Sequence, residues 1–99
     1  MAQFDYYRNP PREDFLLDIQ SDLLDVLRSR VVVPLISIAR FSRPIRNLNP
    51  VFTIEGEQFV MVTEFVGAVP ASELRELKGS LDHCRDDIIR AIDMLLNGV

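Results

Sequence analysis

The sequence is poor in the residues that usually mark enzymes, metal sites and secreted proteins. It has one cysteine, Cys84, so no disulfide can form within a chain, which favours the cytoplasm. It has one histidine, His83, which excludes a histidine-rich metal site or a pair of histidines acting as acid and base within one chain. The four glycines are scattered, so no phosphate-binding loop is predicted. None of these patterns calls for a cofactor.

Long apolar runs are also missing. No stretch approaches the length that spans a bilayer, and residues 1–5 lack the basic region and apolar run of a signal peptide, so no membrane association is expected. A chain of 99 residues predicts a single domain, residues 1–99. A core this small is marginal in a monomer, yet the chain is rich in Leu, Ile and Val. We therefore expect a homodimer.

Acidic residues are absent from one segment of an otherwise acidic chain. The net charge of −4 argues against nucleic acid as the main partner. The segment 28–46 nevertheless has five arginines and no Asp or Glu. Such a strip is either an ordinary solvated face or a site for an acidic or phosphate-bearing partner. Its members are Arg28, Arg30, Arg40, Arg43 and Arg46.

Strand-forming residues dominate the first two thirds of the chain. The β-branched and aromatic runs predict strands over 3–7, 15–20, 30–37, 51–54 and 59–63, and residues 64–69 can add a short one. Pro34 inside the clearest run predicts an edge, bulge or bend. Residues 42–50 are polar and bounded by proline, which predicts a loop.

The C-terminal segment has a helical period instead. Ser80 or Asp82 can cap the helix, and Gly98 suits a left-handed end. The fold class predicted is mainly β, a small barrel of about five antiparallel strands with a C-terminal α-helix. Ile89 and Leu96 broaden the apolar face enough for contact with both the sheet and a second subunit. That face consists of Leu81, Cys84, Ile88, Ala91, Ile92 and Leu95 at spacings of three and four.

No catalytic group stands out. His83 and Cys84 are neighbours, and neighbours on a helix project about 100° apart, so they do not face each other. Cys84 lies on the apolar face and is expected to be structural, whereas His83 is expected to be exposed. The carboxylates are spread along the chain without a reason to pair two of them. The residues thus favour a protein that is not an enzyme.

Several segments match a known family in order and at nearly the same total length. The most specific match is residues 15–25, Phe-Leu-Leu-Asp-Ile-Gln-Ser-Asp-Leu-Leu-Asp. Residues 30–35, 50–54, 61–63, 69–70 and 88–99 follow in the family's order. On these segments the chain closely resembles the CcdB toxins.

The resemblance implies an SH3-like small barrel that forms a symmetric homodimer. It implies a type II toxin–antitoxin toxin that inserts into the DNA gyrase A subunit dimer and traps the enzyme on cleaved DNA. An acidic, partly disordered antitoxin of CcdA type would neutralise it. The two proteins together would repress their own operon, so operator DNA is bound only by the toxin–antitoxin complex.

The resemblance also assigns gyrase-binding residues. The family's terminal Trp-Gly-Ile falls on Asn97, Gly98 and Val99, and Asn97 departs from it because asparagine lacks the stacking area of tryptophan. This departure implies a weaker or altered gyrase contact, or the loss of toxicity. The remaining assignments are Leu23 and Leu24, which follow the Gln-Ser-Asp motif, and Asp93, which stands where the family has an asparagine.

The arginine strip gives the antitoxin a place to bind. An acidic disordered tail would pair with cations. The residues expected to bind it are Arg40, Arg43 and Arg46, with Arg8 and Arg12 in the first loop.

Two alternatives stay open. A MazF-like toxin has the same barrel but cleaves RNA, since fold does not settle function. The single histidine, the net acidity and the closer match to CcdB argue against this reading. The other alternative is an inactive chromosomal homologue that binds antitoxin and poisons nothing.

Overall fold

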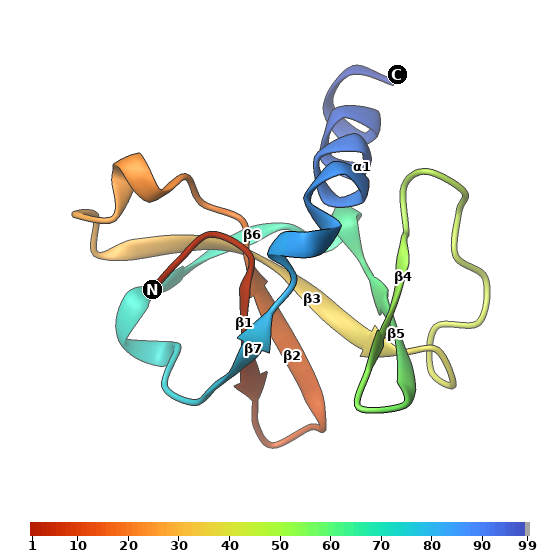
Figure 1. Ribbon diagram of the computed structural model, residues 1–99, viewed down its shortest axis with the longest axis horizontal. Helices are drawn as coiled ribbons and strands as arrows, with labels where there is room; N and C mark the ends of the chain where they lie inside the picture. Colours follow the sequence, from red (N-terminus) through yellow and green to blue (C-terminus); the bar gives the residue numbers. More distant parts are fainter. Residues whose placement is uncertain (99) are drawn as a thin grey trace.

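Seven strands and one C-terminal helix make up residues 1–98, the part of the chain that the computed structural model describes (Figure 1). Four single 3-10 turns, η1 to η4, connect them. In chain order the elements are β1 (Asp5–Asn9), β2 (Asp14–Asp18), η1 (Asp22–Leu24), β3 (Ser29–Ser37), β4 (Val51–Ile54), β5 (Glu57–Met61), η2 (Thr63–Phe65), β6 (Gly67–Pro70), η3 (Ala71–Glu73), β7 (Leu77–Ser80), η4 (Asp82–Cys84) and α1 (Arg85–Asn97).

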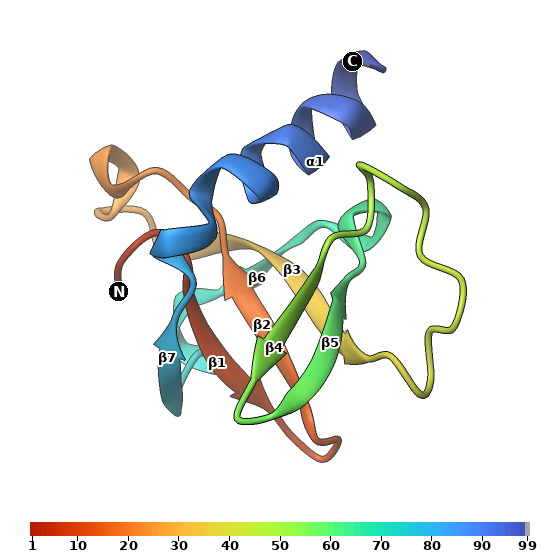
Figure 2. The same cartoon turned by 45° about the vertical axis from the view of Figure 1, so that its right-hand side comes forward.

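The strands form one curled antiparallel sheet in the order β4-β5-β3-β2-β1-β7, with β6 also paired to β3. Strand β3 is long enough to have two partners along one edge. Its first half, Ser29 to Val32, pairs with β6, and its second half, Leu35 to Ser37, pairs with β5. The curl closes the sheet into a half-barrel, and α1 lies across its open side (Figure 2). The predicted fold class is therefore confirmed.

Pro34 lies in the interval of β3 between those two partners. Its carbonyl accepts a hydrogen bond from Val62 N–H at 3.0 Å, so the backbone of Pro34 faces the edge shared by β5 and β6. Proline has no N–H to donate. At this position the missing donor removes no bond to either strand, which explains how a proline fits within a strand that is paired on both sides.

The main core fills the space between the inner face of the sheet and the first half of α1. Ile88 and Ala91 of α1 are fully buried against it, as are Leu17 and Val33 of the sheet. A smaller cluster of Tyr7, Val32 and Leu74 lies outside the sheet, under the segment that follows β6. The helix α1 has 13 residues. Within residues 1–98, no helix combines the length and apolar character that crossing a bilayer demands.

The structure differs from the sequence-based expectation in the number of strands, in several strand bounds and at the start of the helix. The sheet has seven strands rather than about five, because β7 was not predicted and the possible short strand over 64–69 forms as β6. Strands β2 and β5 end at Asp18 and Met61, two residues before the predicted ends. Strand β1 begins two residues late, since Phe4 has a left-handed φ of 72° that interrupts an extended chain. The helix begins at Arg85 because η4 precedes it, and Ser80 Oγ accepts from Asp82 N–H at 3.2 Å at the start of that turn.

Candidate partner-binding surfaces

The C-terminal half of α1 extends beyond the sheet and ends in free space (Figure 1). Ile88 and Ala91 are buried, whereas Asp93 and Asn97 are exposed and Leu96 is 71% exposed. Gly98 ends the helix in the left-handed conformation, with φ of 75° and an N–H bond to the Met94 carbonyl at 3.0 Å, as expected. Val99 lies outside the described residues. The exposed end of α1 thus carries every described C-terminal residue that the resemblance assigned to gyrase.

The second group assigned to gyrase is on η1. Leu23 is 91% exposed and Leu24 48%, and neither packs into the core. Hydrogen bonds from polar side chains next to the turn hold both leucines in exposed positions. Ser21 Oγ accepts from Leu23 N–H at 3.2 Å, and the Gln20 amide donates to the Leu24 carbonyl at 2.9 Å while accepting from Val31 N–H at 3.1 Å. Two leucines are therefore held out toward solvent by a buried glutamine.

These two groups lie on separate elements. The turn η1 and the end of α1 are both on the side of the molecule that carries the helix, well separated in both views (Figures 1 and 2). No hydrogen bond joins them within residues 1–98. A single partner that contacts both must extend across this side, or must meet them from two subunits.

The arginine strip is not continuous, because Arg30 is inside the protein. Its side chain is 1% exposed and pairs with Asp18, with Nε and Nη2 at 2.8 and 2.7 Å from Oδ2. Asp18 is itself fully buried and also accepts from Gln20 N–H at 3.0 Å. The expectation of a five-arginine surface strip was wrong at this position. A buried arginine needs a carboxylate partner, and Asp18 supplies it.

Arg28 is exposed, directly before β3. The arginines expected to bind an antitoxin fall into two groups. Arg12 and Arg40 line one shallow pocket, together with Glu13 and Glu57, and Arg40 also pairs with the buried carboxylate of Asp14. Arg8 pairs with Glu76 at 3.7 Å.

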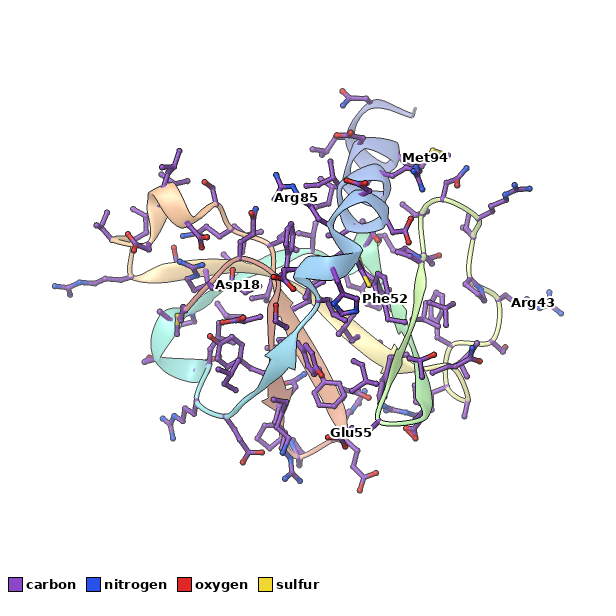
Figure 3. The ribbon with its side chains drawn as sticks, in the orientation of Figure 1. Asp18, Arg43, Phe52, Glu55, Arg85 and Met94 are labelled. Carbon is purple, nitrogen blue, oxygen red and sulfur yellow. The ribbon has the colours of Figure 1, made fainter. Side chains whose placement is uncertain are left out.

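Arg43 and Arg46 form the second group. They are exposed on the loop between β3 and β4, and Figure 3 shows Arg43 pointing outward. Neither forms an ion pair with the described residues. Their cations are available to an acidic partner.

The loop that carries Arg43 and Arg46 is held by a residue that sequence reasoning missed. Asn49 is 3% exposed, accepts from Ile45 N–H at 2.9 Å, and donates to the Met61 carbonyl at 3.2 Å and to Glu64 Oε1 at 2.7 Å. The loop is therefore pinned to β5 at its base. In the sequence, an asparagine beside a proline indicates only a turn, and nothing there predicts its hydrogen-bond partners.

The two candidate reactive residues have the positions expected of them. His83 is exposed, with Nδ1 at 4.0 Å from Asp82 Oδ1. Cys84 is half-buried against the main core, and burial, followed by the charges of Asp87 and Asp82, raises the pKa of its thiol. A thiol in this state is a poor nucleophile. Within residues 1–98 no three metal-ligating side chains gather in one place.

A curled antiparallel half-barrel with one C-terminal helix, exposed leucines on η1 and exposed arginines on the loop after β3 defines the chain as a small mainly-β protein. A family model described as CcdB protein matches residues 3–98 of the 99. The chain therefore belongs to the CcdB family, which comprises toxins of type II toxin–antitoxin systems.

Proposed function

We propose that this protein acts as a gyrase poison by binding, not by catalysis. The exposed end of α1 supports the proposal most directly, because a helix that leaves the sheet presents Asp93, Asn97 and Gly98 to a partner. The target is the DNA gyrase A subunit dimer, trapped on cleaved DNA. Leu23 and Leu24 add apolar contact from η1. Asn97 contributes hydrogen bonds in place of aromatic stacking.

The same proposal includes a homodimer and an acidic antitoxin of CcdA type. A twofold toxin presents two helix ends to a twofold target. The antitoxin tail binds the exposed cations Arg43 and Arg46, with Arg12 and Arg40 as a second contact and Arg8 as a further one. Toxin and antitoxin together bind operator DNA and repress their operon, and the toxin alone does not bind it.

Removal of residues 97–99 tests the gyrase contact. The shortened protein and the intact protein are compared for cleaved plasmid in a reaction with purified gyrase and supercoiled DNA. We expect the intact protein to accumulate cleaved DNA and the shortened one to lose this effect while its circular dichroism spectrum and thermal midpoint stay close to those of the parent. A shortened protein that still traps gyrase contradicts the proposed contact.

Charge reversal tests the antitoxin contact separately. Arg43→Glu with Arg46→Glu is expected to weaken binding of the antitoxin tail and to flatten its dependence on salt, because each lost ion pair removes a screened attraction. Gyrase trapping should persist. The matched control is Arg75→Glu, an exposed arginine of the segment between η3 and β7. Unchanged antitoxin affinity in the double variant contradicts the assignment, and RNA cleavage by the pure protein contradicts binding as the mode of action.

A further inference from the structure

An open pocket of about 300 Å³ lies over the outer face of β3, between the turn that joins β1 to β2 and the turn η2. Leu35 points into the main core, so its neighbours Pro34 and Ile36 point to the outside of the half-barrel. The helix α1 lies across the inner side of the sheet, so these two residues face away from it (Figure 2). We call this site the outer pocket. Its volume is at the lower end of the roughly 300–1,000 Å³ of ligand pockets, which suits a single side chain.

Most of the residues that line the outer pocket are apolar, and three of them are prolines. Proline has a fixed φ and no N–H, so it presents carbon surface without a free donor and loses little freedom on binding. Phe65, on η2, is 62% exposed. An apolar side chain that enters the pocket leaves water and contacts preformed apolar walls. These walls are Pro10, Pro11, Pro34, Ile36 and Phe65.

Arg12 carries the one unpaired charge among the residues that line the outer pocket. Asp14 lines it too, but this carboxylate is buried and pairs with Arg40. Arg12 is exposed and forms no ion pair with another described residue. It also lines the neighbouring shallow pocket that contains Arg40. The apolar site is therefore continuous with cations assigned to the antitoxin, and its free charge is complementary to an acid beside an apolar residue.

The surface next to the outer pocket favours a peptide over a nucleic acid. Glu13 and Glu57 line the shallow pocket together with Arg12 and Arg40, so charges of both signs alternate there. A nucleic acid carries a negative charge on every phosphate and meets these carboxylates, on a protein whose net charge is −4. An acidic peptide can place a few separated carboxylates at the arginines and keep its apolar residues for the pocket.

We propose that the outer pocket binds one leucine-sized apolar side chain of the acidic antitoxin tail, with a flanking carboxylate at Arg12. The inference rests on the proposed function, which supplies the acidic partner. Exposed ion pairs each add little to affinity and weaken as salt rises, so the arginines alone hold a tail loosely. Burial of an apolar side chain is not screened by salt. The outer pocket therefore supplies the part of the affinity that persists at high salt.

Titration of the ¹⁵N-labelled full chain with three synthetic peptides tests the proposal. The first is an acetylated, amidated pentapeptide with a central leucine and two acidic residues on each side, the second has serine at its centre, and the third has lysines in place of the acids. We expect the leucine peptide to shift the amides around Arg12, Ile36 and Phe65 saturably and the serine peptide to bind about fivefold more weakly, a ratio that salt leaves unchanged.

The lysine peptide should not bind the outer pocket. Absence of saturable shifts with the leucine peptide, or equal binding of the leucine and serine peptides, overturns the proposal. Equal binding of the lysine peptide overturns the charge argument. Tighter binding of an oligothymidylate of eight nucleotides at the same amides overturns the choice of a peptide. Shifts of these amides with protein concentration alone would assign the pocket to a second copy of the chain instead.

Variants of the protein locate the site. Phe65→Ser should weaken the leucine peptide by about threefold and leave the serine peptide unchanged, because it removes apolar surface and no charge. The matched control is Leu77→Ser, at a 57% exposed position on β7, which should change neither affinity. Arg12→Gln should weaken both acidic peptides by about twofold. Equal affinity of the parent, Phe65→Ser and Leu77→Ser for the leucine peptide overturns the proposal, with the spectrum of each free variant confirming its fold.

The charge-reversed variant of Arg43 and Arg46 separates this inference from the proposed antitoxin contact. If the reversal weakens binding of the antitoxin tail while the leucine and serine peptides bind the parent alike, the antitoxin contact stands and the outer pocket is overturned. If the leucine peptide selects the outer pocket while the reversal leaves binding of the tail unchanged, the pocket stands and the assignment of those two arginines is wrong.

Discussion

A single glycine sets how closely β7 approaches β1. A Cβ placed on Gly79 would lie 2.5 Å from the Tyr6 hydroxyl oxygen and 2.7 Å from its Cζ, so the ring covers this position. We predict that Gly79→Ala lowers the free energy of unfolding by about 1–3 kcal/mol, because the ring must leave its place beside Phe15. Urea denaturation measures the loss. Gly67→Ala is the matched control, with no atom nearer than 4.0 Å, and equal midpoints for the two variants would refute the argument.

The buried pair of Asp18 and Arg30 is the strongest electrostatic constraint in the core. Removing one partner leaves the other charge in an apolar surrounding. We predict that Asp18→Asn costs about 3–5 kcal/mol in the free energy of unfolding. The control is Asp87→Asn, which breaks the exposed pair with Arg90 at 3.0 Å and should cost less than about 0.5 kcal/mol. Similar losses in both variants would show that burial does not govern the cost.

Cys84 makes stability depend on pH on the alkaline side. Its folded-state pKa is raised above the ordinary value of 9.0, so the unfolded thiol ionises first and the free energy of unfolding falls as pH rises above that value. The raised pKa values of Tyr6 and Tyr7 add a further fall above 10.0. We predict that Cys84→Ala shows a shallower decline from about pH 8.5 to 10 in urea denaturation series. Parallel profiles for the parent and the variant would contradict this.

The sequence predicts which face of the sheet carries Asp18, but it does not predict that Asp18 pairs with Arg30. Alternation along 15–20 puts Phe15, Leu17 and Ile19 on the core face, which the structure confirms, and Asp18 on the other. That outer face is covered by residues after β6, a segment with too few strand-forming residues to be positioned from the sequence. The charge pattern of the sequence therefore could not predict that Arg30 is buried, or that the arginine strip is interrupted at this residue.

At the scale of elements, the strands whose own residues favour extended structure were predicted, and the others were not. Strand β4 has the predicted bounds and β3 differs by one residue, because both are rich in β-branched and aromatic side chains. Strand β7 has the sequence Leu-Lys-Gly-Ser and exists because β1 pairs with it. Its formation depends on a contact distant in sequence, which local propensity does not contain.

The helix α1 has two halves with different roles. Ile88 is fully buried against the sheet, whereas Leu96 is 71% exposed. We predict that Ile88→Ala lowers the free energy of unfolding by about 2–5 kcal/mol, since it removes packed atoms and leaves a cavity. Leu96→Ala is the control. Measured in dilute protein, it should change the free energy of unfolding by less than about 0.5 kcal/mol. A large loss for Leu96→Ala under these conditions would show that the helix end is already covered within one chain.

At the scale of the whole molecule, the candidate contact surfaces lie on different parts of a half-barrel. The helix end and η1 are on one side, and the arginine loop projects beside the sheet (Figures 1 and 3). The family resemblance could name Leu23, Leu24, Asp93, Asn97 and Gly98 from the sequence. It could not supply the distance between η1 and α1, because that distance depends on how the sheet curls.

That arrangement bears on the proposed homodimer, because apolar residues on the helix side are uncovered in a single chain. Leu96 at the end of α1 is exposed in a single chain. We predict that sedimentation equilibrium gives twice the chain mass of 11.3 kDa and that the thermal midpoint rises with protein concentration, as mass action requires of a dimer. Leu96→Glu should shift the equilibrium toward the monomer by placing charge in the contact. Leu77→Glu, an equally apolar and 57% exposed position on β7, should not. A Leu96→Glu protein that keeps the dimer mass would place the interface elsewhere, and a parent protein that stays monomeric at every concentration would remove the twofold basis of the proposed gyrase contact.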